Sequence, residues 1–161
     1  MTLKQAHRNE EAGGALVELA LVLPVLVLVF VGTVDFGRVF YTSQSLVNAA
    51  RAGVQYGAHT PARSADLAGM KTTAEAATGM TGITATASRL CQCASDSGTF
   101  SPTAGTANDC TTPETTSCPG GHRVVTVTVV TTKSFSTLMA GGLPAFMQTM
   151  SLTRTATMRA Q

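Results

Sequence analysis

The sequence has no tryptophan, and only 12% of its 161 residues are charged. A soluble domain usually carries about twice that share of charged residues. The net charge is only +2, and no stripe of basic residues with interleaved aromatic residues is present, as a nucleic-acid-binding surface requires. These shortages exclude a typical nucleic-acid partner. They point instead to a membrane segment and an exterior rich in Ser, Thr, Ala and Gly.

The motifs of common enzyme chemistry are also missing. The sequence has no Gly-x-Ser-x-Gly nucleophile elbow, no glycine-rich phosphate loop after a strand and no C-x-x-C redox motif. His59 and His122 have no acid or nucleophile partner in a recognisable pattern. We therefore predict a protein that is not an enzyme and that uses no metal or other cofactor.

One long apolar run stands near the start of the chain. From Ala15 to Val34 the residues are apolar apart from Glu18 and two small residues near the end. Twenty helical residues rise about 30 Å, the thickness of a bilayer's hydrocarbon core. A helix in a soluble core and a removed signal peptide are the alternatives. A chain this small cannot surround a helix that is apolar on every side, and a signal peptide has an apolar core of only ~7–15 residues. We predict a transmembrane helix over 14–34.

Past the membrane segment the helix is predicted to continue, over 35–60, with one apolar face. The positions on this face recur at helical spacing: Phe36, Val39, Phe40, Ser43, Leu46, Val47, Ala50, Val54 and Gly57. Polar residues, Thr42 among them, fall on the other side. Pro61 biases Thr60 away from helical geometry and so ends the element. The apolar face needs a domain to cover it.

Residues 61–161 are predicted to form that domain, which is exported and of the α+β class, with the long helix packed on a small antiparallel sheet. Alternating and β-branched residues predict strands over 82–90 and 122–132, and an edge strand over 148–160. The segment 133–150 between the last two is predicted to be a short helix or a surface-seeking loop.

A short helix is predicted just after Pro61. Leu67, Met70 and Ala74 share its inner face, and Ser64 is placed to cap it.

All four cysteines, Cys91, Cys93, Cys110 and Cys118, fall in a predicted long loop over 91–121. An even, clustered set in an exported domain indicates disulfides that tie the loop over 91–118. The first two are too close in sequence to bridge each other comfortably, so each is expected to reach one of the other two, and the sequence does not choose between these pairings. A zinc site with His122 nearby is the rival reading, but a C-x-C pair is not the usual ligand spacing.

The charges beside the apolar run indicate its orientation. Lys4 and Arg8 precede it, whereas Arg38 and the more distant Arg51 follow it. Lys and Arg counts favour a cytoplasmic N-terminus only slightly, and the clustered cysteines favour an exported C-terminal part. We predict a single-pass protein of the inner (cytoplasmic) membrane whose C-terminal domain is exported.

The presence of Glu18 requires an explanation, because inserting a carboxylate into a membrane as part of a helix costs about 2.5–3.5 kcal/mol of free energy. The simple reading is that it lies near the headgroups and reaches water. The sharper reading uses Gly13 and Gly14. A cut between them places a new ammonium one helical turn before Glu18, where it can pair with that carboxylate and set the register between packed helices. Pro24, inside the span, predicts a kink, with a local melt during assembly as the alternative.

This N-terminal region resembles a known family. A short polar leader, a glycine, four residues, a glutamate and an apolar helix form the type IV prepilin pattern. More specifically, ALVELALVLP at 15–24, DFGR at 35–38 and NAARAGVQYGA at 48–58 resemble the TadE-like pilus assembly proteins of the tight adherence system. The resemblance covers about residues 12–58 strongly, and beyond them only the coarse layout matches, a long helix on a small sheet in a pilin-like arrangement.

The resemblance implies that residues 1–13 are a leader removed after Gly13 by a prepilin peptidase, that Gly14 is the new N-terminus and that Glu18 is the glutamate of the motif. It implies a minor pseudopilin needed to assemble an Flp/type IVb-like pilus in adherence and biofilm formation. The implied partners are the membrane, the peptidase, other pilin and pseudopilin subunits and the pilus assembly platform. The alternative is a permanently anchored, disulfide-containing envelope binding protein that is not polymerised.

Overall fold

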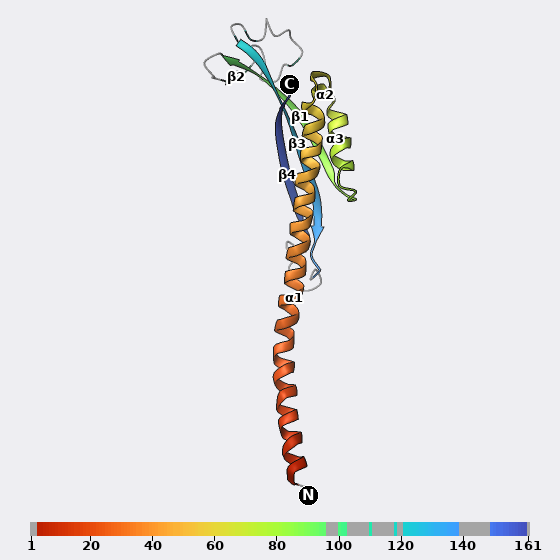
Figure 1. Cartoon of the computed structure of the whole chain (residues 1–161), viewed down its shortest axis with the longest axis vertical. Coiled ribbons are helices and arrows are strands. Elements are labelled where there is room, and N and C mark those ends of the chain that lie inside the picture. The colour runs from red at the N-terminus through yellow and green to blue at the C-terminus, as the bar shows by residue number, and fades with distance from the viewer. Residues whose placement is uncertain are drawn as a thin grey trace.

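The computed structural model describes residues 3–95, 100–102, 110, 118, 121–138 and 149–160, with side chains from Gly13 onward except at 95 and 100–102. Its elements, in chain order, are α1 (Leu3–Ala58), α2 (Pro61–Ala65), α3 (Leu67–Ala76), β1 (Thr84–Ser95), β2 (Phe100–Pro102), β3 (Gly121–Ser136) and β4 (Thr149–Ala160). Figure 1 shows an elongated molecule in which the N-terminal half of α1 extends alone from a domain formed by the remaining elements. The predicted α+β arrangement, a long helix on a small antiparallel sheet, is confirmed.

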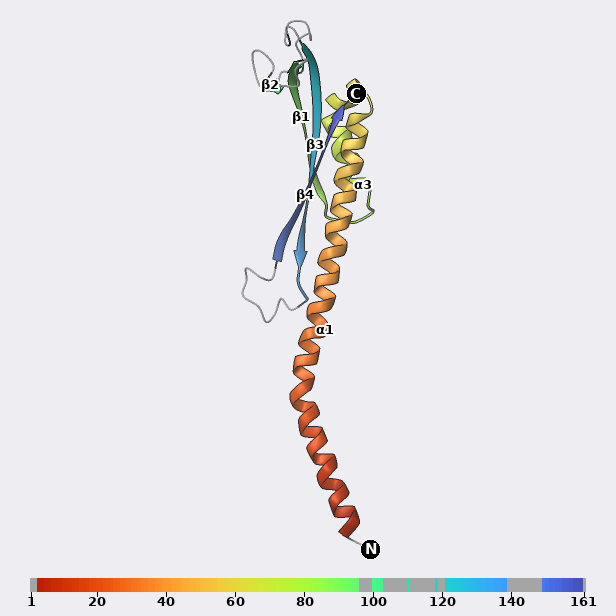
Figure 2. The same ribbon diagram turned by 60° about the vertical axis from the view of Figure 1, so that its left-hand side comes forward.

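Helix α1 is a single element of 56 residues that runs through Pro24 without a break. A proline inside a helix removes one backbone hydrogen bond, and its ring crowds the carbonyl four residues earlier. Figure 2 shows that the N-terminal half of α1 curves gently rather than bending sharply. The helix ends at Ala58, next to the predicted boundary at Pro61.

The sheet has the strand order β2-β1-β3-β4, and every neighbouring pair is antiparallel. The predicted strand over 122–132 lies within β3, and β4 occupies an edge of the sheet as expected. Strand β1 is longer than the predicted 82–90, since it continues to Ser95. Strand β3 likewise continues to Ser136, so the first part of the predicted helix or loop over 133–150 is a strand; residues 139–148 lie outside the described part.

Helices α1 and α3 cover one face of the sheet, α1 over β3 and β4 and α3 over β1. The core between these layers is built from small and medium-sized side chains: Val54, Ala58, Met70, Ala74, Ala85, Val127 and Val129. The opposite face carries hydroxyls that pair across strands, as Thr128 with Thr157 and Thr132 with Thr153, each 3.2 Å apart. The sheet is therefore mainly apolar toward the helices, and its other side carries paired threonines beside valines.

The face predicted for the second half of α1 is confirmed over its C-terminal part, where Leu46, Ala50 and Val54 are buried. It is wrong at Phe36 and Phe40, whose side chains are 74% and 59% exposed. The domain does not extend far enough along the helix to cover them.

Thr42, which was predicted on the polar side of α1, is buried. Its hydroxyl donates to the backbone carbonyl of Arg38 at 2.9 Å, so the buried oxygen keeps a hydrogen-bond partner.

Two short helices stand where the sequence predicted one. The Thr60 hydroxyl accepts from the Arg63 amide at 3.2 Å and caps α2. The Asp66 carboxylate accepts from the Gly69 amide at 2.8 Å and caps α3. The predicted cap, Ser64, is instead buried inside α2 and donates to the Pro61 carbonyl.

Met70 and Ala74 are buried as predicted, but Leu67 is 41% exposed. It is the first residue of α3. Side chains in a helix lean toward its N-terminus, so a first-turn side chain points past the surface that covers the later turns.

Candidate functional site: the exposed helix and its junction with the domain

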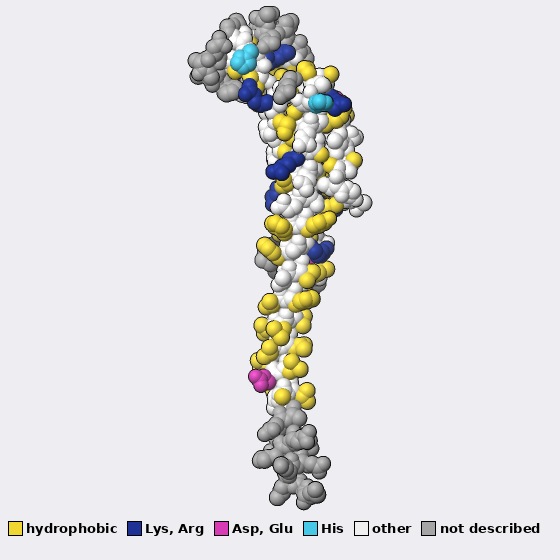
Figure 3. All heavy atoms as spheres, viewed as in Figure 1, with side chains coloured by type: hydrophobic (Ala, Val, Ile, Leu, Met, Phe, Trp, Pro, Cys, Tyr) yellow, Lys and Arg dark blue, Asp and Glu magenta, His cyan; other side chains and the backbone are white. Residues whose placement is uncertain are grey.

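The N-terminal half of α1 presents a continuous apolar surface to its surroundings. Within Gly13–Ala58, a stretch of 18 residues has a mean hydropathy of 2.7, and none of its residues is buried in the structure. Leu16, Leu21 and Phe30 are each about two-thirds or more exposed, and Figure 3 shows apolar side chains over this part of the molecule. By length and composition this helix can cross a membrane, and apolar surface of this extent marks a membrane or protein contact.

Glu18 is the only charged residue between Gly13 and Val34. Its side chain lies on the exposed surface of α1, where Ala15, Leu19 and Val22 line a shallow depression around it. Gly14 precedes Glu18 by four residues on the same helix, so the two positions lie on one face, about 6 Å apart along the axis. This is the placement that the pairing hypothesis requires.

Gly13 and Gly14 lie in α1, and a Cβ built at either position meets no atom within 4 Å. Among the described residues, no atom outside the neighbouring backbone of α1 would crowd a larger side chain at these two positions.

Asp35 links the end of the apolar segment to the domain through hydrogen bonds. Its carboxylate accepts from the Leu138 amide at 2.9 Å, across 103 positions of sequence, and from Arg38 Nη1 at 3.1 Å. The Arg38 guanidinium in turn lies over the Phe135 ring, 5.1 Å from its centroid. The DFGR motif at 35–38 thus joins α1 to the end of β3. Sequence reasoning did not find this role; the i,i+3 spacing of the acid and the base was the available signal.

The NAARAGVQYGA motif at 48–58 brings α1 close to its neighbours. A Cβ at Gly53 would lie 2.9 Å from the Met70 carbonyl oxygen and 3.1 Å from a methyl of Val129. At Gly57 it would overlap the sulfur of Met70. Small residues at these positions are what allow α1 to pack against α3 and the sheet at such short range.

Tyr56, in the same motif, ties α1 to the start of α3. Its hydroxyl donates to the Asp66 carboxylate at 2.8 Å, and the Arg63 guanidinium lies 4.9 Å from its ring centroid. The amide of Gly69, followed by the Tyr56 hydroxyl, lowers the pKa of Asp66 below its usual value of 3.8. The same hydrogen bond to Asp66 raises the pKa of Tyr56. The motif therefore supplies both close packing and a polar link.

Two further hydrogen bonds join the middle of α1 to the sheet. The buried Thr131 hydroxyl donates to the Leu46 carbonyl at 2.9 Å, and Arg154 Nε donates to the Ser43 hydroxyl at 2.9 Å. The C-terminal half of α1 is thus held to β3 and β4 by hydrogen bonds as well as by apolar contact.

The far end of the domain contains two disulfides. Cys91 and Cys93 lie on β1 rather than in a loop, and they point to the same face because they are two residues apart in a strand. Cys91 bonds Cys110 and Cys93 bonds Cys118. All four sulfurs are used in these bonds, so they leave no thiolates for the zinc site considered as an alternative. Within the described part of the chain, no other group of His, Cys, Asp or Glu side chains is placed to bind a metal.

Comparison with known families agrees with the motifs in α1. Residues 13–55 match the family model described as TadE-like protein. The match contains Glu18 and the DFGR motif and ends within the NAARAGVQYGA motif at 48–58. No curated protein and no solved structure shows significant similarity to the chain.

Proposed function

We propose that this chain, whose residues 13–55 are TadE-like, is a membrane-anchored minor pseudopilin. In this proposal it is needed to assemble an Flp/type IVb-like pilus for adherence and biofilm formation. The TadE-like segment itself suggests a role linked to the tight adherence pilus. The observation that carries the finer proposal is the exposed apolar part of α1 between Gly13 and Val34, which contains a single carboxylate and continues into a small α+β domain.

The proposal places the apolar half of α1 in the inner membrane and the domain outside the cytoplasm. Two disulfides in the domain support export, because such bonds persist in oxidising compartments. The partners of this arrangement are the prepilin peptidase, other pilin and pseudopilin subunits and the assembly platform. No enzymatic activity and no cofactor are part of the proposed role.

Processing after Gly13 gives Glu18 its function. The ammonium of Gly14 and the Glu18 carboxylate, if about 4 Å apart, attract each other by roughly 4 kcal/mol at an effective dielectric constant near 20. Burying the carboxylate in a membrane costs about 2.5–3.5 kcal/mol. The ammonium has a burial cost of its own of similar size, so the attraction offsets part of the combined cost, within one chain or between neighbours. A pair formed between neighbours fixes the axial register of two otherwise featureless apolar helices.

The N-terminus of the protein extracted from membranes tests processing. We expect intact mass and N-terminal sequencing to show a chain that begins at Gly14. Gly13→Leu should block the cut and leave the leader attached, visible as a larger mass. Normal trimming of that variant would count against a prepilin peptidase. A retained leader on the unaltered chain would favour the alternative, an anchored envelope binding protein that is not polymerised.

A pair of single substitutions tests the register role. Glu18→Ala should leave membrane insertion intact and reduce the amount of assembled pilus. Val17→Ala removes a similarly exposed side chain next to it and should leave both unchanged. Pilus output would be measured by quantitative immunoblotting of sheared surface fractions, and insertion by carbonate extraction. Unchanged output in Glu18→Ala would show that the carboxylate does not set the register.

A further inference from the structure

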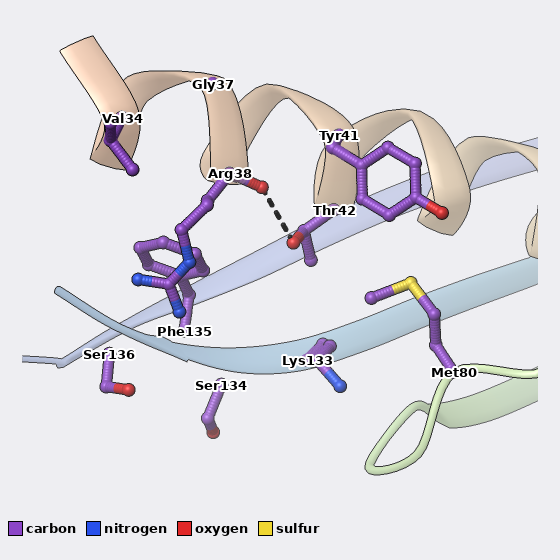
Figure 4. Close-up of a pocket in the computed structure, with 10 residues that line it drawn as sticks. All are labelled: Val34, Gly37, Arg38, Tyr41, Thr42, Met80, Lys133, Ser134, Phe135 and Ser136. Carbon is purple, nitrogen blue, oxygen red and sulfur yellow. Dashed lines mark hydrogen bonds between the residues drawn. The ribbon is translucent and has the colours of Figure 1, made fainter. Parts of the chain in front are cut away.

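We propose that this chain binds the phosphate headgroup of an anionic membrane lipid in a pocket where α1 meets the end of β3. The proposal rests on the membrane anchoring proposed above. The pocket has a volume of about 530 Å³, inside the range of ~300–1,000 Å³ typical of small-molecule sites. Figure 4 shows its lining. Its chemically relevant residues are Val34, Arg38, Tyr41, Met80, Lys133 and Phe135.

The end of the pocket formed by Val34 and Arg38 lies at the depth of lipid headgroups. Val34 is the last residue of the apolar segment, and Arg38 follows it by four residues, which is a rise of about 6 Å along a helix. The polar layer on each side of a bilayer's hydrocarbon core is roughly 5–7 Å thick. When α1 spans the membrane, the Arg38 guanidinium is therefore at the level of the phosphates.

Two cations from distant parts of the sequence line the pocket. Arg38 is oriented by Asp35 and by the Phe135 ring, yet its side chain remains 44% exposed. These contacts use one Nη1 hydrogen and one ring face, whereas a guanidinium carries five N–H donors. Lys133 donates to the backbone carbonyl of Thr81, and an ammonium has three donors. Both groups are held in place with donors left for phosphate oxygens.

The charge and polarity of the pocket fit a lipid. Asp35 balances one of the two positive charges, which leaves a single net positive charge for the single negative charge of a phosphodiester. Val34 and Phe135 supply apolar surface near Arg38, and Met80 supplies it at the other end of the lining (Figure 4). Tyr41 is 67% exposed at the rim, and tyrosine is enriched at membrane interfaces. An amphiphile with a phosphate head uses all of these features, whereas a free anion uses only the cations.

The absence of tryptophan allows a site-specific test. Tyr41→Trp places one fluorophore at the pocket, and Phe40→Trp places one at similar depth on a neighbouring exposed side of α1 that does not line it. Each full-length chain is reconstituted in two preparations of phosphatidylcholine vesicles. One contains a small fraction of phosphatidylglycerol that carries a spin label close to the headgroup, and the other contains the same fraction of phosphatidylcholine with the same label. The ratio of quenching by the two labelled lipids measures local preference for the anionic headgroup.

We expect a roughly fivefold preference for phosphatidylglycerol in the Tyr41→Trp chain, from the worth of one basic residue at a membrane surface. We expect a ratio near one in the Phe40→Trp chain. Adding Arg38→Gln and Lys133→Gln to the Tyr41→Trp chain should bring its ratio down to that of the control. Adding Arg51→Gln and Lys71→Gln, which remove the same charge away from the pocket, should leave the preference intact.

The outcomes separate the headgroup site from the anchor. Equal quenching by both lipids in the Tyr41→Trp chain would overturn the headgroup site and leave the membrane anchor standing. No quenching by either lipid would overturn the anchor and the site together. A preference that excess inorganic phosphate erases would assign the pocket to free phosphate rather than to a lipid. A preference that persists in excess phosphate supports the lipid.

Discussion

Gly53→Ala tests whether the close approach of α1 to its neighbours controls the stability of the domain. The added methyl would lie 2.9 Å from the Met70 carbonyl oxygen, 3.1 Å from the Ala74 methyl and 3.1 Å from a methyl of Val129. Two of these atoms belong to buried side chains, and the third is backbone, so none can move aside freely. Overpacking of this kind costs about 1–3 kcal/mol, while alanine gains up to about 1 kcal/mol over glycine in a helix. The free energy of unfolding should therefore fall by roughly 1 kcal/mol.

Gly37→Ala in the same helix is the matched control. A Cβ at Gly37 meets no atom within 4 Å, so only the helix propensity acts and unfolding should become up to about 1 kcal/mol more costly. Thermal unfolding of the oxidised full-length chain in detergent, followed by circular dichroism, should separate the two variants by several degrees, since about 1 kcal/mol shifts the midpoint of a domain this size by roughly 3–5 °C. If Gly53→Ala is as stable as Gly37→Ala, the close approach is not what limits the packing of α1.

Three further changes probe the links between α1, the loops and the sheet. Asp35→Asn replaces a charged acceptor with a neutral one, so amide exchange at Leu138 should become roughly fivefold faster in hydrogen-exchange measurements; unchanged exchange would show that the Asp35 carboxylate does not hold the Leu138 amide. The pKa of Asp66 is lowered by its hydrogen bonds from Gly69 and Tyr56, so the stability it contributes is complete above its usual pKa of 3.8 and is lost as the pH falls through its lower folded value. Asp66→Asn should remove that part of the acid-induced fall in melting temperature, and an unaltered pH profile would argue against the link. Reduction of the two disulfides, which close loops with sequence separations of 19 and 25, should cost about 3 kcal/mol each and speed proteolysis within 91–118; protease resistance that ignores reduction would refute this.

The elements that could be predicted are those specified by residues that lie close together in the sequence. A run of twenty residues that is apolar apart from Glu18, Gly32 and Thr33 specifies a helix that can span a membrane, and alternating Val and Thr specify β3. The inner face of α1 was also readable from its period, from Leu46 to Gly57. Where the face was wrong, at Phe36 and Phe40, the period was still helical. What the period cannot show is where along the helix the covering domain stops.

The contacts that join α1 to the domain depend on distant parts of the chain. Asp35 meets Leu138 across 103 positions, and Thr131 meets Leu46 across 85. The disulfide pairing likewise needed the geometry of β1, because the sequence alone left two long-range pairings open. Such contacts are set by the register of the sheet and the docking of the helix. For this reason the residues of the junction and of the pocket beside it were not predicted.

Phe36 and Phe40 distinguish the two roles considered for this chain. Both are exposed on α1 just beyond the segment that a bilayer covers. In a permanently anchored protein they remain in the interfacial layer, within reach of water. In a filament, where apolar helices pack side by side, a neighbouring subunit covers them. Hydroxyl-radical footprinting should therefore modify both rings in the membrane-held protein and spare them in assembled pili. Equal modification in membranes and in sheared pilus fractions would mean that α1 does not pack against a neighbour beyond the membrane.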